Sequence, residues 1–224
     1  EEVPEELIKG TRIFHFGTLS MTHEGVEMQQ KNALRAAKEA GAVISFDPNL
    51  REPLWNSLDE AKTGALGLGQ CDILKISDNE IQWLTGEEDF TKGVYWILER
   101  YHIPLILVSM AGKGSRAYYK DLIVEVKPFD TEEYDETTGA GDTFCACVLH
   151  YILEHGLTDL TEDDLKEMLT FANAAASIIT TRKGALRVMP EREEVEKLLS
   201  VSIDTVYTIY ERQITAHILY NDVF

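Results

Sequence analysis

The hydrophobic and polar positions of this chain follow two alternating patterns, one of short apolar runs and one of helical periodicity. The apolar runs have the length of strands and cover residues 13–16, 42–46, 73–76 and 103–110. Turn-forming residues follow the later runs, as in Asp47-Pro48-Asn49 and Gly112-Lys113-Gly114. Short apolar runs bounded by such residues are typical of strands in a buried sheet.

Helical periodicity covers the segments between and after these runs. Residues 27–40 are rich in helix formers and stop before a glycine, which suits the end of a helix. Further helical patterns follow Gly141 and Thr161, and a shorter one covers residues 191–199. Thr161 and Asp164 have the spacing of a capping box, which predicts that a helix begins there.

Strands that alternate with helices predict an α/β fold, in which helices cover both faces of a largely parallel sheet. Residues 117–119 and 122–126 flank Lys120-Asp121 and predict a β-hairpin. We expect one α/β domain over residues 1–200. The tail at residues 201–224 has mixed periodicity, which assigns it to no element.

The chain is strongly acidic, with 39 acidic and 21 basic residues and a formal net charge of −18. Such a surface repels nucleic acids and anionic membranes, so we expect neither as a partner. A local nest of backbone N–H groups can still bind a phosphate against that field. No segment has the apolar length that spans a bilayer, and we expect a soluble cytoplasmic protein.

Several other chemistries lack their sequence signals. Cys71, Cys145 and Cys147 have no spacing typical of a disulfide framework or a zinc site, and the 6 histidines form no metal-ligand pair. Neither the Gly-x-Ser-x-Gly elbow of hydrolases nor the P-loop motif occurs. The sequence therefore favours neither a hydrolase triad nor a P-loop nucleotide site.

The sharpest chemical signal is the segment Glu136-Thr137-Thr138-Gly139-Ala140-Gly141-Asp142-Thr143-Phe144. Its small residues precede a helical pattern, so the backbone can approach a ligand while the first helix N–H groups stay unpaired. Those groups and the helix dipole suit the negative charge of a transferring phosphoryl group. In the first turn, Asp142 can accept the proton of a substrate hydroxyl. An ordinary glycine turn followed by an acidic residue is the alternative reading.

The end of the predicted strand at 42–46 is a second candidate position. Open α/β sheets bind ligands at the carboxyl ends of their strands, which is where Asp47 and Asn49 lie. Asp-Pro-Asn is also a common turn sequence. Arg51 can either bind a phosphate as a bidentate donor or form a surface ion pair.

Motifs in a fixed order resemble the ribokinase-like (PfkB) carbohydrate kinases, and among them the bacterial and plant fructokinases. Residues 136–144 resemble the family signature D-T-x-G-A-G-D, and Asp47-Pro48-Asn49-Leu50-Arg51-Glu52-Pro53-Leu54-Trp55 resembles D-P-N-x-R-x-x-L-W of fructokinases. Residues 75–86, 171–176 and 181–185 are similar to later family segments. The resemblance implies ATP-dependent phosphorylation of a hydroxyl group on a fructose-like sugar.

The resemblance implies a role for each matching position. The general base is Asp142, and the anion hole is the backbone of Gly139, Ala140, Gly141 and Asp142. The nucleotide lies near Asn79, Ser109, Gly112, Gly114 and Asn173, and Mg²⁺ accompanies its phosphates. The substrate and its phosphate lie near Asp47, Asn49 and Arg51. A monovalent cation, usually K⁺, is held by Glu136, Thr138, Ile179, Arg182 and Gly184.

The chain departs from the family pattern at Glu136, where the signature has Asp, and at Gln82, where the family's N-x-x-E ends. It also has Ala111 where a glycine is usual. The long segment that precedes residue 13 in family members, with most sugar contacts and a β-sheet lid, has no counterpart here. The chain begins Glu-Glu-Val without Met, which reads as a fragment or a processed chain.

These departures keep a second function open, namely a non-catalytic nucleotide-binding fragment or relic of a sugar kinase. The 224 residues alone are expected to bind ATP weakly and to phosphorylate fructose negligibly. The resemblance implies that full-length members form homodimers through the lid. The residues that select the sugar belong mostly to the segment without a counterpart, so the sequence does not identify the sugar.

Overall fold

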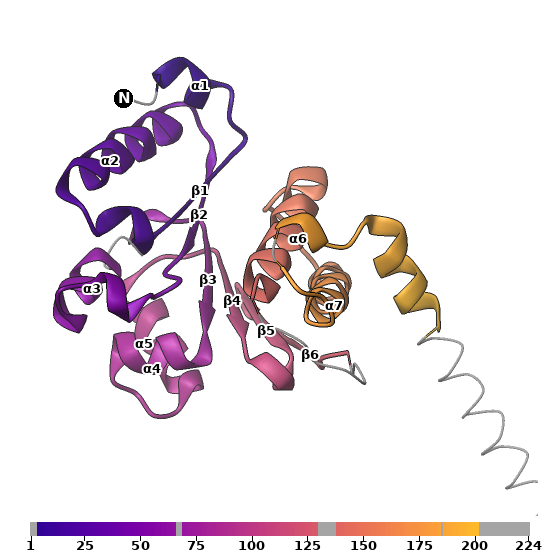
Figure 1. Cartoon of the computed structure of the whole chain (residues 1–224). Helices are drawn as coiled ribbons and strands as arrows, with labels where there is room; N and C mark the ends of the chain where they lie inside the picture. Colours follow the sequence, from indigo (N-terminus) through magenta and orange to yellow (C-terminus); the bar gives the residue numbers. More distant parts are fainter. Residues whose placement is uncertain (1–3, 66–68, 130–137, 185, 202–224) are drawn as a thin grey trace, which may run out of the picture. The chain divides into compact units, whose positions relative to one another are not determined.

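The computed structural model of the protein describes residues 4–65, 69–129, 138–184 and 186–201 (Figure 1). The chain forms two compact units, one of Glu1–Pro128 with Val148–Leu169 and the other of Phe129–Cys147 with Thr170–Phe224. Helices α6 (Ala140–His155) and α7 (Glu162–Ile179) contribute residues to both units. The sheet and the preceding helices belong to the first unit.

The first unit is built on a 6-stranded sheet in which the strands follow their order in the sequence. The strands are β1 (Ile13–Gly17), β2 (Val43–Asp47), β3 (Ile73–Ser77), β4 (Leu105–Ser109), β5 (Ser115–Tyr119) and β6 (Leu122–Val126). From β1 to β4 neighbouring strands are parallel, whereas β4, β5 and β6 pair antiparallel. Tyr119 pairs with Leu122 across Lys120-Asp121, so the predicted hairpin and the largely parallel sheet are both confirmed.

The helices of the first unit that precede or connect the strands are α1 (Glu5–Lys9), α2 (Glu24–Glu39), α3 (Leu58–Ala65), α4 (Asp78–Thr85) and α5 (Phe90–Arg100). Helical periodicity predicted α2, α6 and α7, and the structure confirms them. The capping box of α7 also forms, because the Thr161 amide donates to Asp164 Oδ2 at 2.8 Å and the Asp164 amide donates to Thr161 Oγ1 at 3.2 Å. The sequence analysis did not predict α1, α3, α4 or α5.

Two of the unpredicted helices pack closely against each other, with a glycine at the contact. A Cβ atom on Gly93 of α5 would lie 2.2 Å from Cγ2 of Ile81 in α4, so only glycine fits there without a shift. Gly86 ends α4 with a φ of 78°, a left-handed conformation that glycine adopts at little cost. Gly93 therefore allows α4 and α5 to pack closely, and Gly86 allows the chain to turn between them.

Alternate residues of the strands face opposite sides of the sheet, and both sides are buried. On one side Ile44, Phe46 and Ile106 belong to a core cluster with Ala37 of α2 and Ile97 of α5. The other face carries the buried residues Ser45, Asp47, Lys75, Leu105, Leu107 and Ala117. The first unit's part of α6 and its following loop are tied to the sheet region, since Arg12 Nη2 donates to Leu153 O at 2.5 Å and Tyr119 Oη donates to Leu157 O at 2.9 Å.

The second unit contains the start of α6, the end of α7 and a further helical segment at residues 192–201. Val195 of that segment is buried with Ala174 and Ala175 of α7 in a small apolar cluster. The helix predicted at residues 191–199 is therefore confirmed. Residues 202–224, the greater part of the unassigned tail, lie outside the described residues. A single domain over residues 1–200 stays a prediction.

Candidate active site

The predicted site residues of the first unit gather at the carboxyl edge of the parallel strands. Strand β2 ends at Asp47, which pairs with Gly17 of β1, and β3 ends at Ser77, which pairs with Ser109 of β4. Asn49, Asn79 and Gly112 follow these strand ends within a few residues. The topology therefore brings segments that are far apart in the sequence to one edge of the sheet.

Asp47 is buried and forms an ion pair with Lys75 of the neighbouring strand. Lys75 Nζ lies 2.9 Å from Asp47 Oδ2, and the Asn49 amide donates to Asp47 Oδ1 at 3.1 Å. Burial raises the pKa of Asp47 to about 6, against the opposing attraction of Lys75. The sequence analysis missed Lys75. The sequence did contain a signal for it, namely a lysine inside the apolar run 73–76. A charge buried in such a run requires a partner of opposite charge.

Glu80 connects the start of α4 to the loop after β2. Its Oε2 accepts hydrogen bonds from the Ser77 amide at 2.9 Å and the Ser77 hydroxyl at 2.8 Å, and its Oε1 accepts one from the Leu50 amide at 2.7 Å. The Ser77 hydroxyl in turn accepts from the Glu80 amide, which completes a capping box. This carboxylate was also missed, although the Ser-x-x-Glu spacing was readable. The predicted residue Asn79 and the departure Gln82 are both exposed.

Asn49 and Arg51 lie on the loop that Glu80 holds. Asn49 has a φ of 44°, a left-handed conformation that asparagine tolerates better than most residues. Arg51 is exposed, and its Nη1 donates to Leu50 O at 3.1 Å. Within the described part of the chain it forms no ion pair, so the surface ion-pair reading of Arg51 finds no support there.

The predicted nucleotide loop is a tight turn between β4 and β5. The Met110 amide donates to Gly114 O at 2.9 Å, and the Gly114 amide donates to Ala111 O at 3.0 Å. Gly114 has a φ of 95°, and a Cβ atom there would lie 2.1 Å from Val126 O. Ala111, the departure from the usual glycine, has a φ of 47°. Both positions therefore adopt backbone conformations that favour glycine, and Gly112 between them is exposed.

In the second unit, the glycine-rich segment forms the N-terminus of α6. Gly139 precedes the helix with a φ of 83°, and the Thr143 amide donates to Gly139 O at 2.8 Å. The amides of Ala140, Gly141 and Asp142 precede this first helical hydrogen bond, so the helix offers them no acceptor. Asp142 lies in the first turn and is exposed. The predicted placement of Gly139–Asp142 at a helix N-terminus is thus confirmed.

The remaining predicted residues of the second unit lie on α7 and after it. Asn173 and Ile179 of α7 are buried, and the Arg182 amide donates to Ile179 O at 3.1 Å. The Arg182 guanidinium binds the chain locally, through Val188 O at 3.1 Å and Glu194 Oε1 at 2.5 Å.

Thr138 and Gly184 are exposed, and Gly184 has a φ of 126°. Glu136, the first residue of the signature, lies outside the described residues. The predicted monovalent-cation set therefore stays a prediction.

Two features are absent from the described residues. No helix there is both long and apolar enough to cross a lipid bilayer. The same part of the chain holds no group of at least 3 His, Cys, Asp or Glu side chains placed to bind a metal ion.

Comparison with known proteins gives a consistent family assignment. The model of the pfkB family of carbohydrate kinases matches residues 1–192. Fructokinase-1 of Zea mays is 39% identical over 200 residues, which cover 89% of this chain and 62% of that protein. The chain thus spans about 62% of the length of the first curated relatives it matches.

Solved structures with the same fold agree with this assignment. A fructokinase from Xylella fastidiosa with bound ATP has a TM-score of 0.78 and 27% identity, over 89% of this chain and 64% of that one. The fructokinase from Vibrio cholerae O395 in its fructose, ADP and calcium ion bound form has a TM-score of 0.77 and 25% identity, over 88% of this chain and 65% of that one.

Proposed function

The chain belongs to the pfkB family of carbohydrate kinases, and we propose that it carries the phosphoryl-transfer machinery of an enzyme that phosphorylates a sugar hydroxyl with ATP. The observation that carries the proposal is the N-terminus of α6. There a left-handed Gly139 precedes amides without helical acceptors, and the Asp142 carboxylate lies in the same turn. Fructose is the proposed sugar class, because the relatives named above are fructokinases.

The proposed mechanism assigns two tasks to this helix terminus. The amides of Gly139 to Asp142 and the positive end of the helix dipole stabilise charge on the transferring phosphoryl group. Asp142 accepts the proton of the attacking sugar hydroxyl. Asn79 would lie near a bound Mg²⁺, which would neutralise part of the charge on the phosphates of ATP. The exposure of Asp142 suits direct contact with a bound substrate.

The residues of the first unit are proposed to position the nucleotide and the phosphate. Ser109, Gly112 and Gly114 border the nucleotide, because Gly112 leaves the backbone of their turn exposed without a side chain over it. Arg51, which has no acidic partner in the described part of the chain, binds a phosphate oxygen as a charged donor. Asp47 and Asn49 shape the loop that presents it.

Other predicted roles remain part of the proposal. Asn79 lies near the phosphates and Asn173 near the base of the nucleotide. K⁺ would be held by Glu136, Thr138, Ile179, Arg182 and Gly184. Backbone carbonyls such as Ile179 O are suitable cation ligands because a carbonyl oxygen has a second lone pair beyond its hydrogen bond to the Arg182 amide.

A non-catalytic nucleotide-binding protein is the second candidate. The observation in its favour is the exposed Gln82 where the family motif ends in a carboxylate. Glu80 weakens this argument, because it places a carboxylate on the same helix, at the carboxyl edge of the sheet.

The two candidates differ in turnover. The test offers ATP and a panel of sugars to the protein encoded by the complete gene, and it measures ADP release. Release of ADP that depends on fructose or a related ketose supports the kinase. Nucleotide binding without release of ADP on any sugar of the panel overturns it and supports the second candidate.

A further inference from the structure

A cavity of about 860 Å³ opens at the amino edge of the first unit's sheet, opposite the edge that carries Asp47 and Asn49. Its walls come from the start of β2, the residues just before β3 and β4, the end of β5 and the α6–α7 connection. None of the proposed nucleotide, sugar or catalytic residues lines it. A five-residue strand spans about 16 Å, which separates this cavity from the opposite, carboxyl edge.

Three helices end at this cavity with their negative dipole ends. The residues that follow α2, α5 and α6 supply lining positions, among them Val43, Tyr101 and Leu157. The last turns of helices carry partial negative charge from carbonyl groups without helical partners. The arrangement follows from the alternation of strands and helices. This edge therefore carries partial negative charge, whereas an edge formed by helix N-termini carries partial positive charge and binds phosphates.

The basic side chains in the last turns of these helices are not among the lining residues. Lys38 Nζ donates to Gln70 Oε1 at 3.0 Å, and the Arg100 guanidinium lies 4.0 Å from the centre of the Trp96 ring. His155 Nδ1 lies 3.0 Å from Tyr151 O. The negative ends of the helices are therefore only partly compensated at the cavity.

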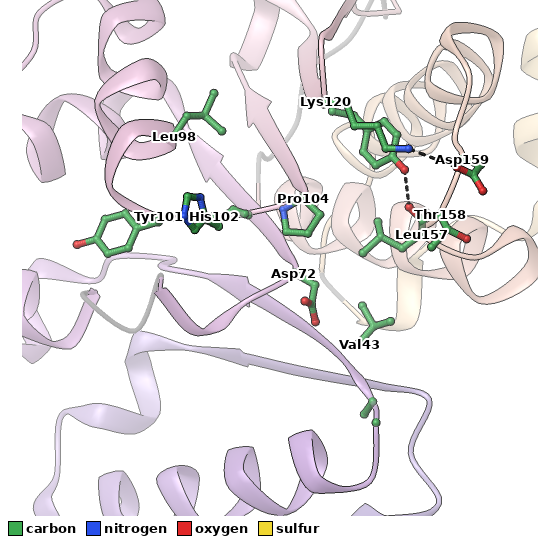
Figure 2. A pocket seen from close by; sticks show the side chains of 14 residues that line it. Val43, Asp72, Leu98, Tyr101, His102, Pro104, Lys120, Leu157, Thr158 and Asp159 are labelled. Carbon is green, nitrogen blue, oxygen red and sulfur yellow. Dashed lines mark hydrogen bonds and ion pairs between the residues drawn. The ribbon is translucent and has the colours of Figure 1, made fainter.

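Two carboxylates and one ammonium group line the cavity. Asp72 Oδ2 accepts a hydrogen bond from the Ile44 amide at 2.8 Å, which fixes the carboxylate and leaves Oδ1 as an acceptor. Asp159 and Lys120 lie 3.4 Å apart and are mostly exposed, so their pair is weak. Figure 2 shows Asp72 in the middle of the cavity view, with Tyr101 and His102 on one side and Lys120 and Asp159 on the other.

The rest of the wall is apolar and aromatic. Val43, Leu98 and Pro104 give it an apolar surface, and Tyr101 and His102 add rings (Figure 2). Aromatic faces attract organic cations as well as apolar groups. An apolar wall around a fixed carboxylate suits a ligand with a cationic head and an apolar or aromatic body.

We propose that this cavity binds a small organic ammonium ion, an amine cation with an apolar body. The ammonium group donates to Asp72 Oδ1 near the helix ends, and the body packs against Tyr101 and Pro104. This proposal concerns a second ligand site and does not depend on the kinase activity. The acidic character of the whole chain, at a formal net charge of −18, adds attraction for such cations.

The first test is an NMR titration of the ¹⁵N-labelled 224-residue chain with benzylamine at pH 7. Benzyl alcohol is the neutral control of the same shape. We expect benzylamine to bind about tenfold more tightly or better, because hydrogen bonds to charged groups are the stronger ones. The shifted amides should be those of 41–43, 72, 101–103 and 157–159. Equal affinity of the two compounds, or amide shifts elsewhere, overturns the proposal.

The second test uses paired variants. Asp72→Asn keeps an acceptor for the Ile44 amide and removes the charge, so benzylamine affinity should fall about tenfold, whereas Glu88→Gln at an exposed carboxylate outside the cavity should leave it unchanged. Tyr101→Phe keeps the ring and should retain binding, while Tyr101→Leu should weaken it about threefold. Unchanged affinity in both Asp72→Asn and Tyr101→Leu contradicts the assignment.

Discussion

At the scale of single residues, the candidate site in the first unit contains a buried ion pair between Asp47 and Lys75 at the carboxyl edge of the sheet. The side chains of both residues are less than one tenth exposed, so each charge has lost most of its hydration. For such pairs the cost of desolvation can exceed the attraction between the charges. The raised pKa of Asp47 has this cause and has a measurable consequence for stability.

Asp47→Asn should change how stability depends on pH. The pKa of Asp47 rises from 3.8 in the unfolded chain to about 6 in the fold, so between these values the folded state binds the proton more tightly. Its contribution to stability is therefore present below pH 3.8 and is lost as pH rises through 6. Urea unfolding from pH 4 to 7 should show the stability of Asp47→Asn, relative to the unsubstituted chain, rising by up to about 3 kcal/mol.

The control for this experiment is Asp121→Asn, which removes an exposed carboxylate in the β5–β6 turn. A relative stability of Asp47→Asn that falls as pH rises would contradict the account. It would mean that the attraction of Lys75 outweighs the desolvation of Asp47.

Ala111 is a second residue with a measurable cost. An alanine at a φ of 47° lies in the left-handed region, which costs an L-residue with a Cβ atom about 1 kcal/mol or more. Ala111→Gly should therefore raise the free energy of unfolding by about 0.5–1 kcal/mol. Ala146→Gly, at an exposed position inside α6, should lower it by about 1 kcal/mol. Chemical denaturation measures both, and the same sign for both variants would refute the strain at Ala111.

At the scale of elements, the β4–β5 connection determines the shape of the predicted nucleotide loop. Strand β4 ends at Ser109, the chain reverses through a short 3₁₀ turn at Ala111–Lys113, and Ser115 then pairs with Ser109. Gly114 makes this reversal compatible with the neighbouring strand β6, whose last residue Val126 lies against it. The conformation of the loop therefore depends more on Gly114, which is packed against Val126, than on Gly112, which has open space around it.

The two glycines of this loop form a matched pair for mutation. Gly114→Ala places a Cβ atom 2.1 Å from a backbone oxygen and should destabilise the protein by about 2 kcal/mol or more. Gly112→Ala has open space around its Cβ position and should change stability by less than about 0.5 kcal/mol. Thermal unfolding compares the two variants. Equal effects would show that the turn relaxes and that Gly114 has no special role.

Sequence reading placed the elements with strong patterns and missed those defined by tertiary packing. Short apolar runs predicted β1 to β4, and the pattern of a β-hairpin predicted β5 and β6. Helix α4 has 8 residues, too few for a clear period, and α5 contains a glycine that its contact with α4 requires.

The same limit holds for the site. Asp47 could be predicted from its place after a strand. Lys75 could be recognised as a charge inside an apolar run, but its pairing with Asp47 could not be predicted, because the contact joins β2 to β3 and depends on the register of the two strands.

At the scale of the whole molecule, the candidate chemistry is divided between two units. Asp47, Arg51 and the β4–β5 turn belong to the first unit, and Gly139, Asp142 and Asn173 belong to the second. Helices α6 and α7 continue from one unit into the other. Positioning of the reactants supplies much of the rate acceleration in phosphoryl transfer, so the proposed mechanism is best tested on the protein encoded by the complete gene.

The most direct test of this account is the turnover of Asp142→Asn in the protein encoded by the complete gene, with ATP and fructose. Asp163→Asn, at an exposed carboxylate in the first turn of α7, is the matched control. We predict that Asp142→Asn retains ATP binding but loses kcat by about 10²- to 10⁴-fold, the usual contribution of a general base, while the control keeps its activity. A loss of less than about tenfold for Asp142→Asn would show that Asp142 is not the base and would contradict the proposed mechanism.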